Sequence, residues 1–370
     1  MDKNSIYLVH GTDPGKMATD LLNACDLASL IGDSRKSIVL KPNLVIAGTP
    51  ENGAVTHPQI VVAVIQYLQK HGFQNIKIIE GSWVGGDTKR AFALNGYPKI
   101  SRKYNVPLLD LKTDHYEKCT IAGITMEISE QALHADFLIN LPVLKGHCQT
   151  RMTCALKNMK GILSDRSKRM FHTLGLHRPI AALNLARRPD FTLVDNICGD
   201  LDFEEGGSPV PTNRALAALD PVLLDSFCAT QMGLSPSDIP YIGFAESLGI
   251  GSTDLSKLKL IELNNPSDNP SSAGLQTGGR VRKLEKYANS DSACSACYAN
   301  LIHALARMEE DGTLGHLKPS SICIGQGYRG KSSANSNCIG VGNCTRLFNT
   351  SVQGCPPSAS AIRQVLENLQ

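Results

Sequence analysis

A strand–helix–strand pattern near the N-terminus constrains the fold of this chain more than any other feature. The segment SIVLKPNLV at 37–45 is a β-branched apolar run that ends at Lys41-Pro42-Asn43, which is typical of a buried strand followed by a loop. Apolar residues recur at helical spacing over 60–68, and NIKIIEGS at 75–82 predicts the next strand. Because such a β–α–β unit joins parallel strands, we expect an α/β fold.

The ends of the predicted helix carry recognisable signals. Thr56 followed by Gln59 predicts a capping box, and Pro58 suits the first helical turn. Gly72 is the residue type expected just after the last turn. His57, between these signals, is expected to have a capping or packing role.

Similar segments follow and predict a second α/β half. Asp220-Pro221 is expected to open a helix as its cap and first residue. The predicted strands of this half lie at 135–147, 191–197, 241–251 and 257–263. The fold expected over 1–265 is therefore two parallel-sheet α/β halves.

Composition narrows the class of protein. The 370 residues are 42% hydrophobic and 19% charged, which is ordinary for a folded chain and excludes a disordered one. The net charge of +3 is too close to balance for a protein that binds nucleic acid by neutralising phosphates. Aromatic residues make up only 5%, so a stacking platform for single strands is not expected either.

We expect a cytoplasmic protein, because neither a signal peptide nor a membrane span is recognisable in the sequence. The first residues, MDKNSIYLVHGTDPGK, lack the apolar core of a signal peptide, and the apolar run IVVAVI at 60–65 is too short for a membrane span. A cytoplasmic chain keeps its thiols reduced, so a group of cysteines there favours metal binding or catalysis over disulfides.

Composition changes after residue 263 and predicts a domain boundary. Asn, Pro, Ser and Gly dominate the start of 264–292, as in a linker. We therefore expect a first α/β domain over 1–265, a linker over 266–290 and a cysteine-rich α/β module over 291–370.

Six of the 12 cysteines lie between positions 294 and 355, close to the C-terminus. Cys294 and Cys297 form a CxxC that enters a predicted helix, while Cys344 lies in GVGNC and Cys355 in GCPP. Two residues between thiolates let both reach one metal centre, and the neighbouring glycines remove side-chain bulk beside the ligands. These four cysteines predict a [4Fe–4S] site, with Cys338 as a further candidate ligand.

Other roles for these thiols stay open. A structural zinc site uses the same ligand type, although normally as two short knuckles, whereas ten residues separate Cys344 from Cys355. A redox-active CxxC is a weaker alternative, because further cysteines lie close in sequence. Cys323 lies inside an apolar predicted strand and is expected to be a buried core thiol.

The segment VQGCPPSASAIRQVL at 352–366 resembles the GCPP segment of small cluster-bearing subunits of respiratory NADH:quinone oxidoreductase and [NiFe] hydrogenase. In those proteins the cysteine of GCPP binds a [4Fe–4S] cluster beside a flavodoxin-like sheet. The resemblance implies the same role for Cys355 and a smaller, flavodoxin-like fold for the module. A flavin stays compatible with the sequence as well.

Basic and amide side chains gather in loops of the predicted first domain. Lysines and glycines at the carboxyl ends of parallel strands favour an anion-binding pocket. The candidate anion-binding residues are Lys41, Asn43, Asn158 and Lys160, and the candidate catalytic residues are Lys145, His147 and Lys157. His147 is the expected proton donor, because imidazole titrates near neutral pH. Asp195 and Asp225 are candidate acids, with Asp225 expected to be exposed or paired with a lysine.

Several motifs of this region resemble the domain-of-unknown-function 362 family. They are KPNLV at 41–45, THP at 56–58, EGS at 80–82, DFLINLPVLKGH at 136–147, LKNMKG at 156–161, ALDPVLLDSFCATQMGL at 218–234 and ESLGIGSTDLSKLKLIEL at 246–263. The resemblance implies an iron–sulfur protein, since members are often joined to a ferredoxin module. The CxxCxxCxxxCP run of bacterial ferredoxins is absent here, and the CxxC, GNC and GCPP segments stand in its place.

Three functions remain after this reasoning. The first is a cytoplasmic iron–sulfur protein that transfers electrons to a small anionic substrate or to a partner protein such as a ferredoxin. The second is a non-redox isomerase or lyase whose metal site is structural. The third is a sensor that reports the state of the cluster to a partner.

Overall fold

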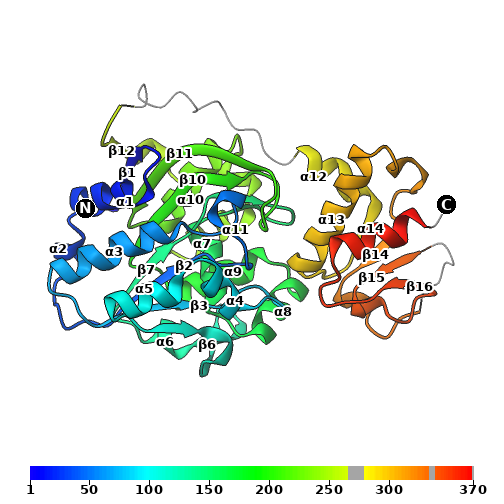
Figure 1. Ribbon diagram of the computed structural model, residues 1–370, viewed down its shortest axis with the longest axis horizontal. Coiled ribbons are helices and arrows are strands. Elements are labelled where there is room, and N and C mark those ends of the chain that lie inside the picture. Colours follow the sequence, from blue (N-terminus) through cyan, green and yellow to red (C-terminus); the bar gives the residue numbers. More distant parts are fainter. Residues whose placement is uncertain (266–278, 333–337, 369–370) are drawn as a thin grey trace. The chain divides into compact units, whose positions relative to one another are not determined.

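The computed structural model describes residues 1–265, 279–332 and 338–368. The chain divides into two compact units (Figure 1). The first contains Met1–Lys168 and His177–Thr277, and the second contains Arg169–Leu176 and Gly278–Gln370. The second unit therefore includes a short segment from the middle of the sequence as well as the C-terminal region.

An eight-stranded sheet forms the centre of the first unit, in the order β12-β1-β11-β10-β7-β2-β3-β4. The bounds are β1 (Ser5–His10), β2 (Ile38–Pro42), β3 (Ile76–Glu80), β4 (Leu108–Asp110), β7 (Phe137–Leu141), β10 (Phe191–Asp200), β11 (Pro209–Ala218) and β12 (Lys259–Glu262). Among these described strands only β11 runs against the others, because it pairs antiparallel with both β1 and β10. The predicted α/β class with a largely parallel sheet is confirmed, and the two expected halves share one sheet.

Helices cover the sheet. Their bounds in the first unit are α1 (Pro14–Ala24), α2 (Leu27–Ile31), α3 (Pro58–Lys70), α4 (Thr88–Leu94), α5 (Tyr97–Tyr104), α6 (Glu130–Leu133), α7 (Ala155–Asn158), α9 (His177–Ala186), α10 (Pro221–Gln231) and α11 (Pro240–Ser247). α8 (Asp165–Thr173) begins in the first unit, and its residues from Arg169 onward belong to the second. α1 and α3 pack against each other, whereas α9 and α10 pack against α7, which contacts β7, and α11 packs against α9 and α10.

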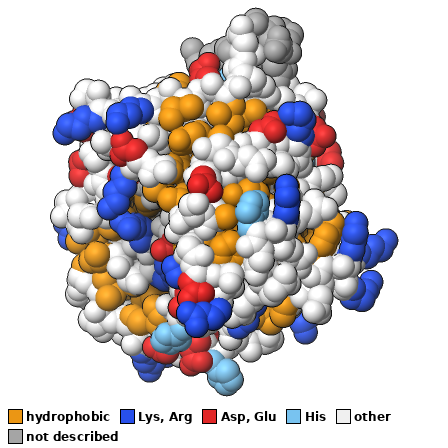
Figure 2. All heavy atoms as spheres, turned by 90° about the vertical axis from the view of Figure 1, so that its left-hand side faces the viewer, with side chains coloured by type: hydrophobic (Ala, Val, Ile, Leu, Met, Phe, Trp, Pro, Cys, Tyr) orange, Lys and Arg blue, Asp and Glu red, His pale blue; other side chains and the backbone are white. Residues whose placement is uncertain are grey.

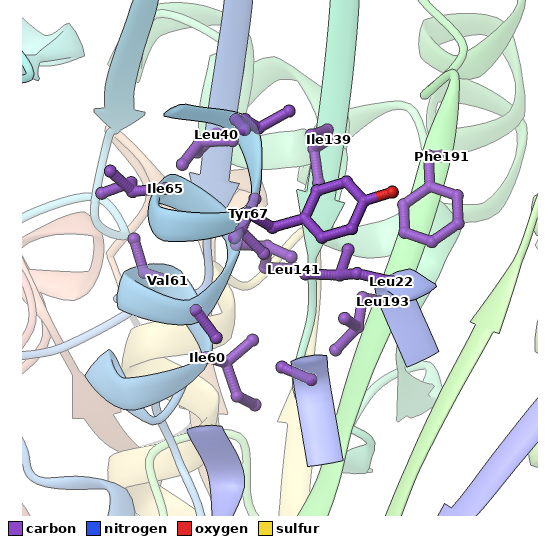
Figure 3. Packing of buried hydrophobic residues seen from close by; sticks show 14 of the residues in the cluster. Leu22, Leu40, Ile60, Val61, Ile65, Tyr67, Ile139, Leu141, Phe191 and Leu193 are labelled. Carbon is purple, nitrogen blue, oxygen red and sulfur yellow. The ribbon is translucent and has the colours of Figure 1, made fainter. Parts of the chain in front are cut away.

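The core beneath α1 and α3 is apolar and closely packed (Figure 3). Ile60 and Val61 on α3 and Leu40 and Ile139 on the sheet are all fully buried there. Because strand residues alternate between the two faces, neighbours such as Leu138 are buried on the opposite face. Burial on both faces explains the continuous apolar runs of these strands.

Hairpins lie beside this sheet in the first unit. One joins β5 (Tyr116–Ile121) to β6 (Ile124–Ser129), and another joins β8 (Lys145–His147) to β9 (Arg151–Thr153). β8 follows shortly after β7, so the predicted strand over 135–147 is two strands separated by a short break. This break turns β8 away from the sheet and places the Lys145 loop at the carboxyl edge of β7.

The second unit is a small parallel α/β structure. Its four strands lie in the order β13-β14-β15-β16. The bounds are β13 (Ala288–Ser290), β14 (Ile322–Ile324), β15 (Ile339–Val341), β16 (Thr350–Val352), α12 (Gly279–Leu284), α13 (Ser295–Glu310) and α14 (Ala359–Glu367). α13 packs against both α12 and α14. Residues 266–278 of the predicted linker lie outside the described residues, whereas 279–290 contain α12 and β13.

Two local predictions are wrong. The segment 241–251, predicted as a strand, contains α11, because Pro240 starts a helix whose residues Tyr241, Ile242 and Ala245 bury one face. The capping box at α3 is also absent. His57 is the N-cap without a side-chain cap bond, since the Thr56 hydroxyl instead accepts from the Asn43 amide and donates to the Leu141 carbonyl.

The described residues include no helix that is both long enough and apolar enough to cross a bilayer. Figure 2 shows one face of the molecule, on which side chains of both charge signs are interspersed with apolar and uncharged polar surface. The predicted cytoplasmic location stays a prediction.

Candidate functional site

A buried ion pair lies at the carboxyl edge of the main sheet. Lys41 lies near the end of β2, and Glu80 ends the neighbouring strand β3. The Lys41 Nζ atom lies 3.0 Å from Glu80 Oε2, and both side chains are buried. Glu80 also accepts from the backbone amides of Leu44 and Gly81. Burial lowers the pKa of Lys41, while the Glu80 carboxylate opposes this shift.

Lys168 and Gly161 close around this pair. Lys168 Nζ donates to the carbonyls of Gly81 and Ser82 at 3.0 and 2.9 Å, and burial lowers its pKa to about 8. A Cβ atom at Gly161 would lie 2.2 Å from Glu80 Oε1 and 2.6 Å from Lys41 Nζ. A methyl group at this position would therefore force the Glu80 and Lys41 side chains to shift.

Lys145, at the start of β8, is fully buried and bound largely by main-chain oxygens. Its Nζ donates to the carbonyls of Ala54 at 2.5 Å and Glu204 at 2.7 Å, and Asn43 Oδ1 lies 3.5 Å away. Burial lowers the pKa of Lys145 to about 7, although Glu204 opposes the shift. An amine with this pKa is able to exchange a proton near neutral pH.

Glu204 joins the other two predicted catalytic residues. It lies in the loop between β10 and β11, where its Oε2 atom is 2.9 Å from Lys157 Nζ and 3.1 Å from His147 Nε2. Burial alone would raise the pKa of Glu204, yet His147, Lys157 and Lys145 hold it well below its ordinary value. The structure thus brings Lys145, His147 and Lys157 together around one carboxylate.

His147 is neutral in this network. Its Nδ1 atom accepts from the amides of Gln149 and Thr150, so the ring proton lies on Nε2, which is 3.1 Å from Glu204 Oε2. Burial lowers the pKa of His147 to about 4. This value differs from the neutral titration expected from the sequence, because the site excludes water from the ring.

The hairpin loop that carries Glu204 packs directly on β8. A Cβ atom at Gly146 would lie 2.1 Å from the Leu201 carbonyl oxygen. Asp200 fixes the loop, since its carboxylate accepts from the amides of Asp202, Phe203 and Ser208. Glycine at β8 and this carboxylate together bring Glu204 over the lysines.

The predicted anion-binding residues bind to different partners within the protein. Asn43 lies beside Lys145, whereas Asn158 Nδ2 donates to the Lys41 carbonyl at 3.4 Å and to Asn140 Oδ1 at 2.8 Å. Lys160 is partly exposed, unlike the buried Lys41. The carboxylates of Glu80 and Glu204 thus occupy the positions next to the lysines that a substrate anion was expected to take.

His57 and Asp195 form a pair that sequence reasoning did not join. His57 Nδ1 and its backbone amide both lie 2.8 Å from Asp195 Oδ2. Burial lowers the pKa of His57, but the Asp195 carboxylate outweighs this effect and raises it overall. The two residues are 138 positions apart. Pairing of β10 with β7 and of β7 with β2 is what brings them together.

Asp225 is neither exposed nor paired with a lysine, contrary to expectation. It lies fully buried in α10, and its two oxygens accept from the amides of Ala155 and Leu156 at 2.7 and 3.1 Å. Burial raises the pKa of Asp225 to about 7, while these amides lower it. Asp225 therefore caps the first turn of α7, which carries Lys157 and Asn158.

Glu204 is a candidate site residue that the sequence did not suggest. It lies before a Gly-Gly turn in the segment LDFEEGGSPV. Two adjacent acidic residues in such a segment are typical of an ordinary solvent-exposed loop. A signal was nevertheless present, because a buried lysine such as Lys157 requires a buried partner of opposite charge.

The second unit brings the four predicted ligand cysteines close together. Cys294 is the N-cap of α13 and Cys297 lies in its first turn, whereas Cys344 lies in the turn after β15 and Cys355 follows β16. Burial raises the pKa of Cys297. Three neighbouring thiols raise it further, namely Cys294, Cys355 and Cys344. The other three side chains are therefore within electrostatic range of Cys297.

Two glycines lie in the turns that carry these thiols. Gly342 has φ +90°, and a Cβ atom there would lie 3.7 Å from Cys297 Sγ. Gly354 has φ +141°, a conformation that side chains rarely adopt, and a Cβ atom would lie 2.5 Å from Pro357 Cα. The N-terminus of α13 adds a positive dipole end that favours a bound anionic group.

Arg329 provides a positive charge beside the thiols. Its Nε atom lies 3.4 Å from Cys344 Sγ, and this hydrogen bond raises the pKa of Arg329. Cys294 and Cys355 act on the arginine in the same direction. Sequence reasoning missed this residue, because it lies fifteen positions before Cys344 in a separate turn.

Cys338 lies with Cys323 rather than with the four predicted ligands. The two thiols hydrogen bond to each other, and Tyr328 also bonds to Cys323. Strand pairing explains this, since Cys323 is opposite Gly340 in the parallel β14–β15 pair. Cys338, two residues before Gly340, therefore falls on the same face as Cys323. The six C-terminal cysteines divide into a group of four and a pair.

The segment 169–176 contacts the CxxC region within the second unit. His172 Nε2 lies 3.5 Å from the Ser295 amide, next to Cys294. Gln326 Nε2 donates to the Arg169 carbonyl at 2.9 Å.

Across residues 1–265, 279–332 and 338–368, no group of three or more His, Cys, Asp or Glu side chains is arranged to hold a single metal ion.

Comparison with known proteins identifies a family and similar proteins. The family model described as "Domain of unknown function (DUF362)" matches residues 38–230. This range covers the carboxyl-edge network of the first unit and none of the C-terminal cysteines.

A curated relative is the "Thylakoid-associated protein sll1697" of Synechocystis sp., which is 27% identical over 227 residues, or 58% of this chain and 69% of that protein. Among solved structures, the lactate racemase apoprotein from Thermoanaerobacterium thermosaccharolyticum matches with a TM-score of 0.43 and 17% identity. That match covers 62% of this chain and 57% of the racemase chain.

Proposed function

Because the chain belongs to the DUF362 family, whose matched region lacks the C-terminal cysteines, we propose that the second unit adds an iron–sulfur centre to the family domain. In this proposal Cys294, Cys297, Cys344 and Cys355 hold a [4Fe–4S] cluster. When bound, such a cluster accepts and donates single electrons. The protein would then act in electron transfer or in redox chemistry on a small anionic substrate.

The grouping of four thiols from three separate segments is the observation that carries this proposal. Cys297 responds electrostatically to the other three cysteines, although Cys344 and Cys355 are distant from it in the sequence. Thiolates are the ligands of iron–sulfur clusters, and hydrogen bonds to their sulfurs are a usual feature of these sites. The hydrogen bond from Arg329 to Cys344 is of this kind.

Reconstitution with iron and sulfide under anaerobic conditions tests this proposal. We expect about four irons and four sulfides per chain, a broad visible absorbance, and an EPR signal after reduction. The variant Cys344→Ser should bind less iron while its far-UV circular dichroism stays that of the parent. Stoichiometric zinc without iron or sulfide would overturn the proposal in favour of a structural zinc site.

The first unit would hold the substrate in this proposal. Lys41, Lys145 and Lys157 supply positive charge at the carboxyl edge of the sheet, where ligands of open α/β sheets bind. Since Glu80 and Glu204 already contact these lysines, an incoming anion would have to displace a carboxylate. Competition between small carboxylates and the Glu204 side chain is measurable as a change in the lysine Nζ signals by NMR.

Lys145 supports a second candidate function, a non-redox isomerase or lyase. Its pKa of about 7 suits proton transfer to and from a carbon atom beside a carboxylate. This function predicts that solvent deuterium enters a small carboxylate and that Lys145→Met abolishes the exchange. It also predicts that Cys355→Ser lowers the stability without removing this activity.

A further inference from the structure

A long stretch near the C-terminus contains basic residues but no acidic ones. Residues 312–366 contain no aspartate or glutamate, although the whole chain contains 34 acidic residues. The same stretch contains five basic residues, which are Lys318, Arg329, Lys331, Arg346 and Arg363. It also contains Cys344 and Cys355. Positive charge therefore accumulates in the part of the chain that supplies half of the proposed ligands.

Two packed turns bring three of these cations around Cys344. The 3₁₀ turns Gln326–Tyr328 and Asn343–Thr345 contact each other. The rings of Tyr328 and Phe348 meet edge to face at 5.8 Å. Arg329, the first of these cations, directly follows Tyr328. Lys331, the second, has its Nζ atom 5.8 Å from the centre of the Tyr328 ring, so it is held on the same packed pair of turns.

The third cation, Arg346, follows Cys344 by two residues. Arg329, Lys331 and Arg346 are all exposed, and Leu347 beside them is 51% exposed. We call these four side chains the Cys344 face. Exposed cations together with an exposed apolar side chain suit a polar protein–protein contact, in which charge steers the encounter and apolar contact supports it.

A carboxylate also borders this face. Asp291 lies against Gly327, since a Cβ atom on Gly327 would be 1.9 Å from Asp291 Oδ2. The Asp291 carboxylate also accepts a hydrogen bond from the Ser292 hydroxyl. Three cations outweigh this carboxylate, so the Cys344 face is positive. Two of the four thiols are also accessible, because Cys355 is exposed and Cys344 is partly exposed.

We propose that the Cys344 face is the docking surface for an acidic one-electron carrier protein. This inference rests on the proposed iron–sulfur function. In the step that docking would permit, one electron would leave the reduced carrier, which becomes oxidised by one electron, and would reduce by one electron the cluster that the four cysteines would hold. No bond forms or breaks, and no proton moves. The residues of this face serve to bring an acidic partner close to Cys344 and Cys355.

Binding to an acidic plant-type [2Fe–2S] ferredoxin, used as the probe, tests the inference on the full chain purified anaerobically. Calorimetry at low ionic strength should detect a complex that weakens at least tenfold at about 0.15 M salt, where the Debye length is about 8 Å. Arg346→Glu should weaken binding about tenfold, because it reverses one exposed charge but leaves the bond from Arg329 to Cys344. Arg282→Glu makes the same charge change on α12 and should bind like the parent.

Each outcome separates this inference from the iron–sulfur proposal when iron and sulfide are measured on the same sample. Ferredoxin binding that is independent of salt, or unchanged in Arg346→Glu, would overturn the docking surface. Binding of duplex DNA through Arg346 with no ferredoxin binding would overturn it too, by assigning the face to a polyanion. A chain that contains the cluster but does not bind ferredoxin contradicts only the docking surface. A chain that binds ferredoxin through Arg346 but contains no iron supports the docking surface and contradicts the iron–sulfur proposal.

Discussion

Lys41 and Glu80 form an ion pair across two adjacent parallel strands, with 3.0 Å between Nζ and Oε2 and side-chain exposures of 0% and 3%. The pair is held by more than its own attraction. Pro42 accepts from Lys41 Nζ, and the amides of Leu44 and Gly81 donate to Glu80. Each charge thus has partners that offset its removal from water, which a buried pair requires.

Removing one charge of this pair should cost far more stability than removing both. We expect Glu80→Gln to lower the free energy of unfolding by about 3–5 kcal/mol, because it leaves the Lys41 ammonium buried without its counter-charge. The double variant Lys41→Met, Glu80→Gln should lose clearly less, since the amide oxygen still accepts from the backbone. Urea denaturation of both single variants and the double variant measures this coupling. Losses that simply add would contradict it.

Gly161 should not tolerate a methyl group. A Cβ atom there would lie 2.2 Å from Glu80 Oε1, so Gly161→Ala should lower the free energy of unfolding by about 1–3 kcal/mol through overpacking. Gly243, in α11, is the matched control because a Cβ atom there meets nothing within 4 Å. Gly243→Ala should be neutral or stabilise by up to about 1 kcal/mol. Equal effects of the two substitutions would be evidence against close packing at Gly161.

His147 should make stability depend on pH below neutrality. Its pKa is about 4 in the folded chain against an ordinary value of 6.5, so the unfolded chain binds more protons between these values. The free energy of unfolding should therefore rise with pH in this window and fall as the medium is acidified. In His147→Gln, which keeps a donor towards Glu204, this dependence between pH 6.5 and about pH 5 should be flatter. An unchanged slope in denaturation measurements would contradict the neutral imidazole.

Cysteine substitutions should separate the group of four thiols from the pair. Cys338→Ser and Cys323→Ser should keep the iron content of the reconstituted parent, because these two thiols bond to each other. Cys344→Ser should lose iron, since Cys344 lies with Cys297 and accepts from Arg329. Iron and sulfide analysis of the three variants provides the measurement. Iron lost equally from Cys338→Ser would make Cys338 a ligand.

Local patterns predicted most elements that position the candidate sites. The β-branched run before Lys41 and the apolar spacing after Pro58 gave β2 and α3 within a few residues. The prediction of a strand over 241–251 was wrong, because the aromatic and β-branched residues of this segment favour a strand by propensity. Burial of Tyr241, Ile242 and Ala245 on one helical face outweighed that preference.

The sequence by itself determined the α/β class, the position of the lysine-bearing loops at strand ends, and the CxxC at the start of a helix, because these follow from contacts between near neighbours in the chain. Only the tertiary structure decided which charges and thiols meet. Lys41 and Glu80 are 39 residues apart, and Lys157 and Glu204 are 47 apart. Strand order and register bring such residues together, and they also place Cys338 with Cys323 instead of with Cys344. Pairing of this kind depends on the packing of the whole sheet, which no local pattern encodes.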